Sequence, residues 1–406
     1  QSNFIVLGNS SHTTLQIPGI QSGASNGDIL TFNSSAGKLE LQTPSAGGAT
    51  DLNGLSDCLV DTDSLYVGEV PAGLSGNPQG NTVLGIDAGA ALTSATNNTL
   101  IGNDAGKSIT NLSVSNVIVG RRAGMNKTSG SNATIIGTSA GRSSASGSYV
   151  VLIGAEAGIS NTGDNAIAIG LEAGRVNTAT STISIGYHAG YSQTSGASNT
   201  NIGYQAGYSN TANNDRTIIG YQAGYFNTGP SNTFIGRGAG YGVSGASTGE
   251  QNTAIGTYAL NVARNGKYNT AIGWGAGMNM TTGQWNTLIG RSAGNAINNG
   301  EKNVVIGVNA NVFGVNAQNQ IVIGQGATGT ANNQITLGDS NITALRIPGL
   351  QSGASDGDVL TFASGTGLIT LQAAGGGGGG ASDLNGLTDC LVDTDSLYVG
   401  EVPSGL

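Results

Sequence analysis

A short pattern of hydrophobic and polar residues recurs along the middle of the chain. Each copy reads close to Asn-Thr-x-Ile-Gly-x-x-Ala-Gly, as in Asn98-Thr99-Leu100-Ile101-Gly102. The residues three and one before the first Gly are Thr or aliphatic and then aliphatic, which is the period-two alternation of a β-strand. That Gly recurs at nearly constant steps, at positions 85, 102, 120, 137, 154, 170, 186, 203, 220, 236, 256, 273, 290, 307, 324 and 338.

Each repeat is expected to form one coil of a solenoid. The Gly allows a sharp backbone turn, and the Ala three residues later, such as Ala206 or Ala223, is small enough for the inside of a narrow coil. The expected turning glycines include Gly102, Gly137, Gly170, Gly203, Gly220, Gly236, Gly273 and Gly290. The expected coil core is the residue before the Gly: Ile101, Ile136, Ile169, Ile202, Ile219, Ile235, Ile255, Ile272, Ile289 and Ile306.

The repeat predicts an all-β fold, a parallel β-roll or β-solenoid rod of about sixteen coils with about 17 residues in each. Helix is excluded because a Gly every few residues would cost about 1 kcal/mol apiece relative to Ala. With about 4.8 Å between coils, the rod would be roughly 75–80 Å long. Each coil offers few inward apolar side chains, so we expect self-association. Three chains around a common axis would bury one face of every coil, although periodicity alone does not fix that number.

Composition agrees with a long, thin molecule. Of 406 residues, 70 are Gly, 9% are charged and only 6 are Phe and 2 Trp, too few large side chains for a thick core. The 37% share of hydrophobic residues argues against disorder. Glycine has no three-residue period and Pro is scarce, which excludes collagen.

The charge balance limits the partners. The formal charge of −9 comes from 14 basic and 23 acidic residues, and the largest basic cluster is the pair Arg121 and Arg122. Nucleic acid and anionic membranes are therefore not expected partners. No stretch approaches the roughly 20 apolar residues that a membrane span needs, so no membrane insertion is expected.

The repeats resemble the head repeats of trimeric autotransporter adhesins over residues 81–340, as in Asn232-Thr233-Phe234-Ile235-Gly236. The resemblance implies a left-handed parallel β-roll in a homotrimer. It also implies a role in adhesion at a cell surface.

A second, much longer repeat lies outside the rod. Residues 15–23 return as residues 345–353, and residues 51–74 return as residues 383–406 with two differences. Residues 3–8 also match residues 333–338. We therefore expect the chain to be a window from a longer protein built of superrepeats, each about as long as the stretch from Leu15 to Leu345.

These repeats divide the chain. The stretch Gly27-Asp28-Ile29-Leu30-Thr31-Phe32, with its copy at residues 357–362, resembles a short β-module of fibre and appendage proteins of tailed phages. This resemblance favours a virion fibre. The expected parts are the end of a preceding rod (1–14), a small β-module (15–44), a linker with an acidic, Cys-containing module (45–80), the β-roll rod (81–340), the second β-module (341–374), a Gly-rich linker (375–382) and the second Cys-containing module (383–406).

Candidate chemistry is sparse. His12 and His188 are isolated, so we expect surface roles and neither a catalytic nor a metal site. No Gly-x-Ser-x-Gly elbow with partner residues occurs, so no enzyme activity and no cofactor are expected. Two acidic clusters would either bind Ca²⁺ or, as we favour, stay solvated or cap turns: Asp57, Asp61, Asp63 and Glu69, repeated as Asp389, Asp393, Asp395 and Glu401. Cys58 and Cys390 are equivalent positions that the rod separates, so they cannot pair with each other; we expect both to be buried and reduced, and interchain bridges within the trimer are the alternative.

Seven tyrosines fall in register along the rod. Three directly follow the coil Gly and four lie five residues after it, namely Tyr187, Tyr204 and Tyr221, and Tyr191, Tyr208, Tyr225 and Tyr241. One interpretation is that rings at the same position stack along the rod. The other is a ladder that contacts glycans.

The sequence favours a non-enzymatic, fibrous homotrimer at the virion surface, part of a tail or head fibre of a tailed phage. It would contact other virion or fibre subunits and a host-cell surface, including its glycans. The alternative is a stalk of a trimeric autotransporter adhesin at the bacterial cell surface. A third class, a polysaccharide-cleaving tailspike, would need paired carboxylates in a groove, and no such pair stands out.

Overall fold

The computed structural model describes side chains in residues 59, 63–68, 74, 78–110 and 113–344. Several strands outside these ranges are described by their backbone: β1 (Ile29–Asn33), β2 (Lys38–Gln42), β3 (Cys58–Asp61), β21 (Val359–Ala363), β22 (Leu368–Gln372), β23 (Cys390–Asp393) and β24 (Ser396–Val399). The chain forms two units, residues 1–339 and residues 340–406. All regular elements of the described residues are β-strands, as predicted.

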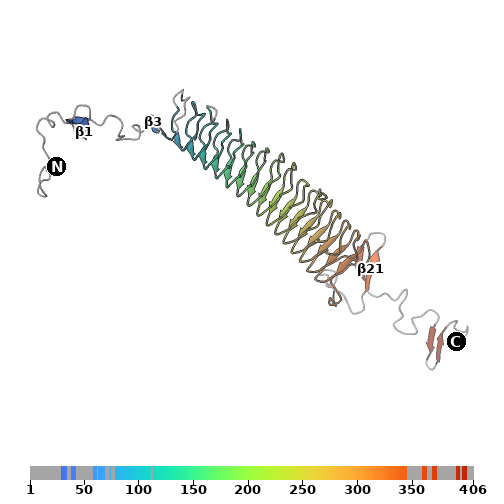
Figure 1. The fold of residues 1–406 in the computed structure, drawn as a ribbon. Helices are drawn as coiled ribbons and strands as arrows, with labels where there is room; N and C mark the ends of the chain where they lie inside the picture. The colour runs from blue at the N-terminus through green and yellow to red at the C-terminus, as the bar shows by residue number, and fades with distance from the viewer. Residues whose placement is uncertain are drawn as a thin grey trace, which may run out of the picture. The chain divides into compact units, whose positions relative to one another are not determined.

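The first unit is dominated by one ladder of short parallel strands (Figure 1). It starts at β4 (Ser64–Val67), which pairs in parallel with the strand that follows it. Sixteen three-residue strands continue the ladder: β5 (Thr82–Leu84), β6 (Thr99–Ile101), β7 (Val117–Val119), β8 (Thr134–Ile136), β9 (Val151–Ile153), β10 (Ile167–Ile169), β11 (Ile183–Ile185), β12 (Thr200–Ile202), β13 (Thr217–Ile219), β14 (Thr233–Ile235), β15 (Thr253–Ile255), β16 (Thr270–Ile272), β17 (Thr287–Ile289), β18 (Val304–Ile306), β19 (Ile321–Ile323) and β20 (Ile335–Leu337).

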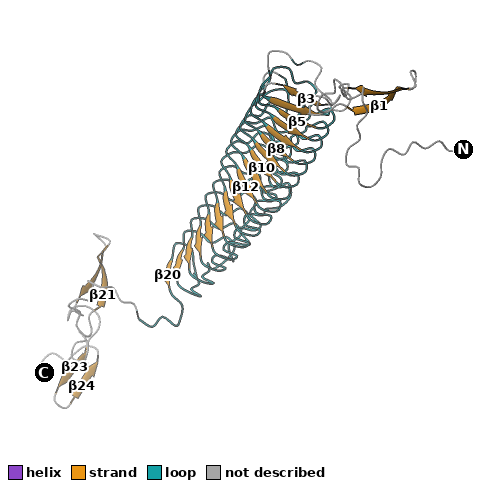
Figure 2. Cartoon of the chain, turned by 90° about the vertical axis from the view of Figure 1, so that its left-hand side faces the viewer, coloured by secondary structure: helices purple, strands orange, loops and turns teal. Residues whose placement is uncertain are grey.

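Strands of successive coils pair in the register of the sequence repeat. Thr217 pairs with Thr233, and Ile219 pairs with Ile235, so equivalent residues lie above one another. The strands β5–β20 are therefore joined by fifteen coils (Figure 2). The predicted parallel β-solenoid is confirmed, with about fifteen coils where the sequence predicted about sixteen. The ladder begins before residue 81 because β4 belongs to it.

The coil glycines turn the backbone in a conformation that other residues rarely adopt. The eight glycines named above have φ between 125° and 134°. A Cβ on Gly220 would lie 2.5 Å from the carbonyl oxygen of Gly236 in the next coil. Gly is required here both by its φ and by the close approach of successive coils.

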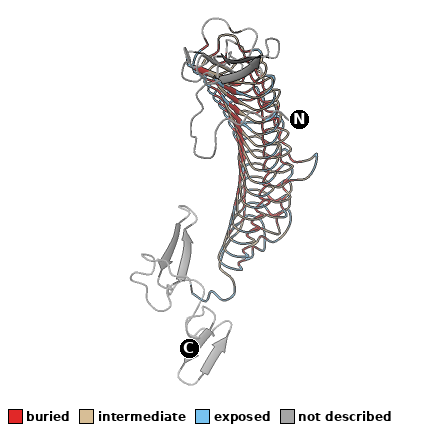
Figure 3. Cartoon of the chain, turned by 60° about the vertical axis from the view of Figure 1, so that its left-hand side comes forward, coloured by how far each residue is buried: buried red, intermediate tan, exposed pale blue. Residues whose placement is uncertain are grey.

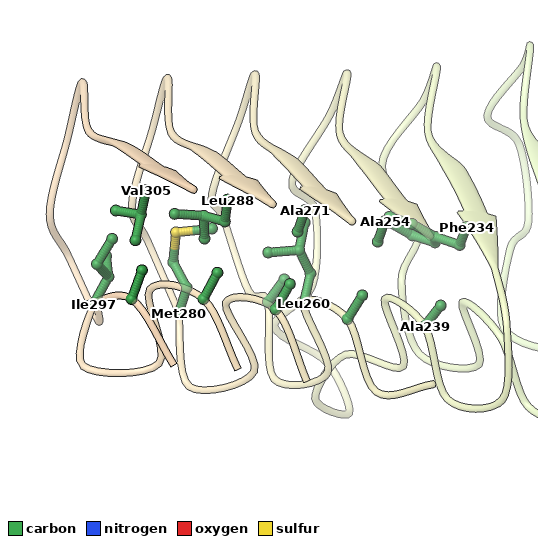
Figure 4. Close-up of a cluster of buried hydrophobic side chains, with 14 of the residues drawn as sticks. Phe234, Ala239, Ala254, Leu260, Ala271, Met280, Leu288, Ile297 and Val305 are labelled. Atoms are coloured by element: carbon green, nitrogen blue, oxygen red, sulfur yellow. The ribbon is translucent and has the colours of Figure 1, made fainter. Parts of the chain in front are cut away.

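In β5–β19 the buried residue of each strand is the middle one, two before the Gly. Leu100, Ile218 and Phe234 have no exposed surface. They pack against the Ala three residues after the Gly and against further residues of the same turn, and Figure 4 shows Phe234, Leu288 and Val305 pointing from the strands toward the opposite turns. The buried positions follow the coils along the whole ladder (Figure 3).

The isoleucines that the pattern assigned to the coil core lie on the opposite face of the ladder. Ile136, Ile272 and Ile289 keep 36–37% of their surface exposed, and the others are half-buried. Period-two alternation defines two faces of a strand without saying which one the coil encloses. The assignment to the coil core was therefore wrong for all ten isoleucines, which face outward from the single coil: Ile101, Ile136, Ile169, Ile202, Ile219, Ile235, Ile255, Ile272, Ile289 and Ile306.

The coil interior combines two apolar clusters with buried polar side chains. One hydrophobic cluster extends from Tyr66 to Ala173 and the other from Ala206 to Ala327. The inward side chains between and beside them include buried polar ones: Lys127, Ser144, Asn161, Asn177, Thr182, Ser184, Gln193, Asn199, Asn201, Asn210, Arg216 and Asn227. The coils that enclose these residues therefore rely on hydrogen bonds as well as on apolar contact.

Two of these polar groups are cations without a buried carboxylate partner. Lys127 donates to the carbonyl of Gly147 at 2.7 Å, and burial lowers the pKa of its ammonium to about 8. Arg216 is fully buried and donates to the carbonyl of Asn227 at 2.7 Å. Burial lowers the pKa of Arg216 to about 10. Burial thus disfavours the charged form of both side chains.

The long repeat has the same strand pairing in both copies. Ile29 pairs with Gln42 in β1–β2, and Val359 pairs with Gln372 in β21–β22, an antiparallel hairpin in each case. Cys58 pairs with Val67, as Cys390 does with Val399. The side chains of both cysteines, His12, the Gly-rich linker and the acidic clusters apart from exposed Asp63 lie outside the described residues.

Candidate functional site: two tyrosine ladders and an apolar sheet face

Three tyrosines that follow the coil Gly form one stacked ladder. Tyr187 and Tyr204 have ring centroids 5.0 Å apart and planes 12° apart, and Tyr204 and Tyr221 repeat this at 5.0 Å and 7°. The solenoid places equivalent residues directly above one another, so rings at one position stack at about the coil spacing.

Four tyrosines five residues after the Gly form a second ladder. The ring centroids of Tyr191, Tyr208 and Tyr225 follow at 4.9 Å, with planes 6° apart. Tyr241 ends the ladder, 5.5 Å from Tyr225. Partial burial raises the pKa of the Tyr208 and Tyr225 hydroxyls.

Stacking determines what the ladders can contact. The inner ring Tyr204 has a tyrosine neighbour on both faces, so its exposed 41% belongs mainly to the ring edge and the hydroxyl group. Sugars pack on the apolar faces of aromatic rings. A ladder of covered faces therefore offers a sugar little along its length, and only its terminal rings have a face left.

Cations lie against the ends of the ladders. The Arg175 guanidinium is 5.4 Å from the ring centroid of Tyr191. At the other end, the Arg237 guanidinium lies 5.8 Å from Tyr221 and 5.4 Å from Tyr258, between the two rings. Such contacts hold an arginine in place through the quadrupole of the ring.

A polar column runs between the two ladders, two residues after each coil Gly. His188 stacks on Tyr187 at 3.8 Å and its Nε2 lies 3.0 Å from Glu172 Oε2. In the next coils Gln222 Nε2 donates to Gln205 Oε1 at 2.8 Å. His188 is thus bound into the ladders, and the described residues contain no group of three His, Cys, Asp or Glu that could hold a metal ion.

A hollow of about 250 Å³ lies where both ladders end. Its walls include Tyr221, Tyr241 and Tyr258, with Arg237 and Asn261 beside them. The polar column is interrupted here, because the residue that follows Gln222 in this column is Gly238. The coil that begins at Gly236 is also the longest, since the next coil Gly is Gly256, so it departs from the repeat twice.

The predicted tyrosine set therefore has two parts. Tyr187, Tyr191, Tyr204, Tyr208 and Tyr225 lie within the ladders, whereas Tyr221 and Tyr241 also line the hollow. Arg237, Gly238, Tyr258 and Asn261 were missed by the sequence reasoning. The sequence feature that could have pointed to them is the departure from the repeat, at Gly238 and in the length of the coil that begins at Gly236.

The outer face of the ladder is a second candidate surface. The residues three and one before each coil Gly form two columns without a single charged side chain over β5–β20. The first column holds only Thr, Val and Ile, and the second only Ile, Leu and Val. Most of these side chains are half-buried or exposed in the single chain, as the outward isoleucines are.

Comparison with known proteins found no match: neither a protein-family model nor a curated protein matches the chain. Within the described residues no helix is long and apolar enough to cross a membrane.

Proposed function

We propose that this chain forms the rod of a homotrimeric fibre on the surface of a tailed-phage virion, with a structural, non-catalytic role in spanning distance and contacting the host surface. A parallel β-solenoid rod is compatible with a fibrous structural protein. Other fibre or virion subunits would continue the rod beyond the superrepeat.

The uncharged outer sheet face carries the proposal for assembly. Fifteen intervals of about 4.8 Å give the face a length of about 70 Å, and with a width of about 10 Å it would cover about 700 Å². Contiguous apolar patches on soluble monomers are rarely larger than a few hundred Å². A face of this size reaches roughly the area that one partner contributes to a stable interface, about 800 Å².

A second copy of the same face is its best partner. Identical flat columns of Thr and Ile on each chain have no charge that would repel one another. Facing inward around a common axis, three such faces would form a continuous apolar interior. The resemblance to trimeric autotransporter adhesin heads supports three chains, and the predicted resemblance of the β1–β2 and β21–β22 segments to phage appendage modules supports a virion fibre. The cell-surface adhesin stalk remains the alternative.

Light scattering of the purified chain tests the assembly. We expect three times the chain mass, 40.1 kDa, at micromolar concentration, together with strong resistance to thermal unfolding. A stable monomer at that concentration would contradict the homotrimer. The flanking gene sequence tests the origin, since a membrane-anchor barrel would support the adhesin, and neighbouring capsid or tail genes would support the fibre.

A further inference from the structure

We propose that the hollow at the end of the two tyrosine ladders binds a single sugar residue that carries a carboxylate, as part of a surface glycan. It deepens the adhesive part of the proposed function, on which it rests, but does not depend on the number of chains in the fibre. The residues that would hold the sugar are Tyr241, Tyr258 and Arg237, with Gln222 and Asn261 beside them.

The hollow contains a ring face that the ladders do not use. Tyr241 is the last ring of its ladder, and the equivalent residue of the next coil is Asn261, which is not aromatic. The next coil therefore places no aromatic ring against the second face of Tyr241, which lies toward the hollow. A pyranose ring has apolar C–H faces of similar size, and burying them against an aromatic face is favourable.

Arg237 gives the hollow a positive charge. Its side chain is held between the rings of Tyr221 and Tyr258, and it takes part in none of the ion pairs of the described residues. No Asp or Glu lines the hollow, although acidic residues outnumber basic ones in the chain, 23 to 14. A guanidinium fixed in this way matches a carboxylate in two-point geometry.

Amide oxygens supply partners for sugar hydroxyl groups. Asn261 Nδ2 donates to the carbonyl of Gly238 at 3.0 Å, and Gln222 Nε2 donates to Gln205 at 2.8 Å. With both amide nitrogens engaged, the oxygens of the two side chains are oriented as acceptors. A few fixed polar groups beside aromatic walls are typical of small-molecule sites.

Gly238 is the residue that keeps the space open. It has φ +61°, the conformation that Gln205 and Gln222 adopt at the equivalent positions, so the backbone itself would accept a side chain. A Cβ at Gly238 would lie 2.8 Å from Tyr258 Cδ1 and 3.3 Å from Asn261 Nδ2. A larger side chain would fill the hollow. The volume of about 250 Å³ lies just below the usual range for drug-sized ligands, about 300 to 1,000 Å³, which suits one sugar residue.

The chain offers a matched control for filling the hollow. Gly275 occupies the same position of a later coil with φ +62°, and a Cβ there would have its nearest neighbour at 3.8 Å. Gly238→Gln and Gly275→Gln therefore make the same change in the same backbone conformation. Only the first enters the hollow.

The experiment uses the full chain on a glycan array that carries uronic acid- and sialic acid-containing oligosaccharides beside their neutral counterparts. We expect binding to acidic members, weakened by salt. Arg237→Gln and Gly238→Gln should each weaken this binding about tenfold or more, and Gly275→Gln should not change it. Circular dichroism melting curves establish that each variant is folded.

Binding to no glycan, or to neutral and acidic members equally, would overturn the proposal. So would acidic binding that survives both Arg237→Gln and Gly238→Gln. If Gly238→Gln does not fold, Arg237→Gln decides alone, because its side chain is exposed. Light scattering on the same samples separates this result from the test of the trimer. A trimer that binds no glycan would contradict only the proposed sugar site, and a monomer that binds acidic glycans would contradict only the proposed assembly.

Discussion

Asn286 donates two hydrogen bonds to one oxygen of Asn269 in the coil before it. The backbone N–H of Asn286 lies 3.0 Å from Asn269 Oδ1, and its side-chain Nδ2 lies 3.1 Å from the same atom. Asn269 in turn makes the same pair of bonds to Asn252, at 3.1 and 3.0 Å. Buried side chains four residues before the coil Gly thus form an asparagine ladder beside the strands, with all their polar atoms inside the protein.

Removal of one rung should be costly. Asn269→Ala would leave the backbone N–H of Asn286 and the carbonyl of Gly283 without their partner, and Asn286 Nδ2 would keep only its other acceptors, such as the carbonyl of Gly300. We expect the free energy of unfolding to fall by about 2–4 kcal/mol, since each orphaned buried group costs about 1–3 kcal/mol. Thermal melting followed by circular dichroism measures this. The exposed Asn279→Ala is the control, and an equal loss in both variants would contradict the role of the ladder.

Adjacent isoleucines of β13 should separate folding from assembly. Ile218 is fully buried inside the coil, whereas Ile219 lies on the outer sheet face. Ile218→Asp should unfold the coils around it, because an unpaired carboxylate inside costs several kcal/mol. Ile219→Asp should keep the β-sheet signal in circular dichroism and reduce the mass by light scattering. An Ile219→Asp protein that still assembles fully would place the interface elsewhere.

The buried Lys127 predicts how stability depends on pH. Its pKa is about 8 in the folded chain and about 10.5 in the unfolded one, so the folded state binds fewer protons between these values. The free-energy cost of burying the charged ammonium is fully present below pH 8 and disappears as the pH rises toward 10.5. The free energy of unfolding should therefore increase from pH 7 to 9.5. Lys127→Met should remove this increase and stabilise the protein by about 3 kcal/mol at pH 7.

Denaturant unfolding at several pH values measures the effect of Lys127. The exposed Lys302→Met provides the control, and it should retain the increase between pH 7 and 9.5. If wild type and Lys127→Met show the same pH dependence, the ammonium of Lys127 is solvated in the folded protein.

Inner rungs of the tyrosine ladders should matter for stability alone. Tyr208 stacks on Tyr191 and on Tyr225, and it does not line the hollow. Tyr208→Ser should lower the free energy of unfolding by about 1–3 kcal/mol, as each stacked pair contributes about 0.5–1.5 kcal/mol beyond its burial. Binding to host cells should survive. Loss of binding at unchanged melting temperature would instead favour a ladder that contacts glycans along its length.

The sequence by itself determined the solenoid. When a strand pattern repeats at nearly constant steps, with a Gly after each strand, its backbone N–H and C=O groups find hydrogen-bond partners by pairing in register with the other copies of the strand. The positions of β5–β20, the turning glycines such as Gly220, the small inward Ala and the stacking of Tyr187 on Tyr204 all follow from that single constraint.

Only the tertiary structure decided which face is inside and where the ladders end. The period-two alternation of a strand places Ile218 and Ile219 on opposite faces of β13. Which face the coil encloses depends on how the turn after Gly220 folds back, and this turn brings Ala223 against Ile218. The hollow at Gly238 has the same origin. Tyr241 and Tyr258 belong to successive coils, and they line one hollow because the stacking of these coils brings them together while Gly238 leaves the space between them open.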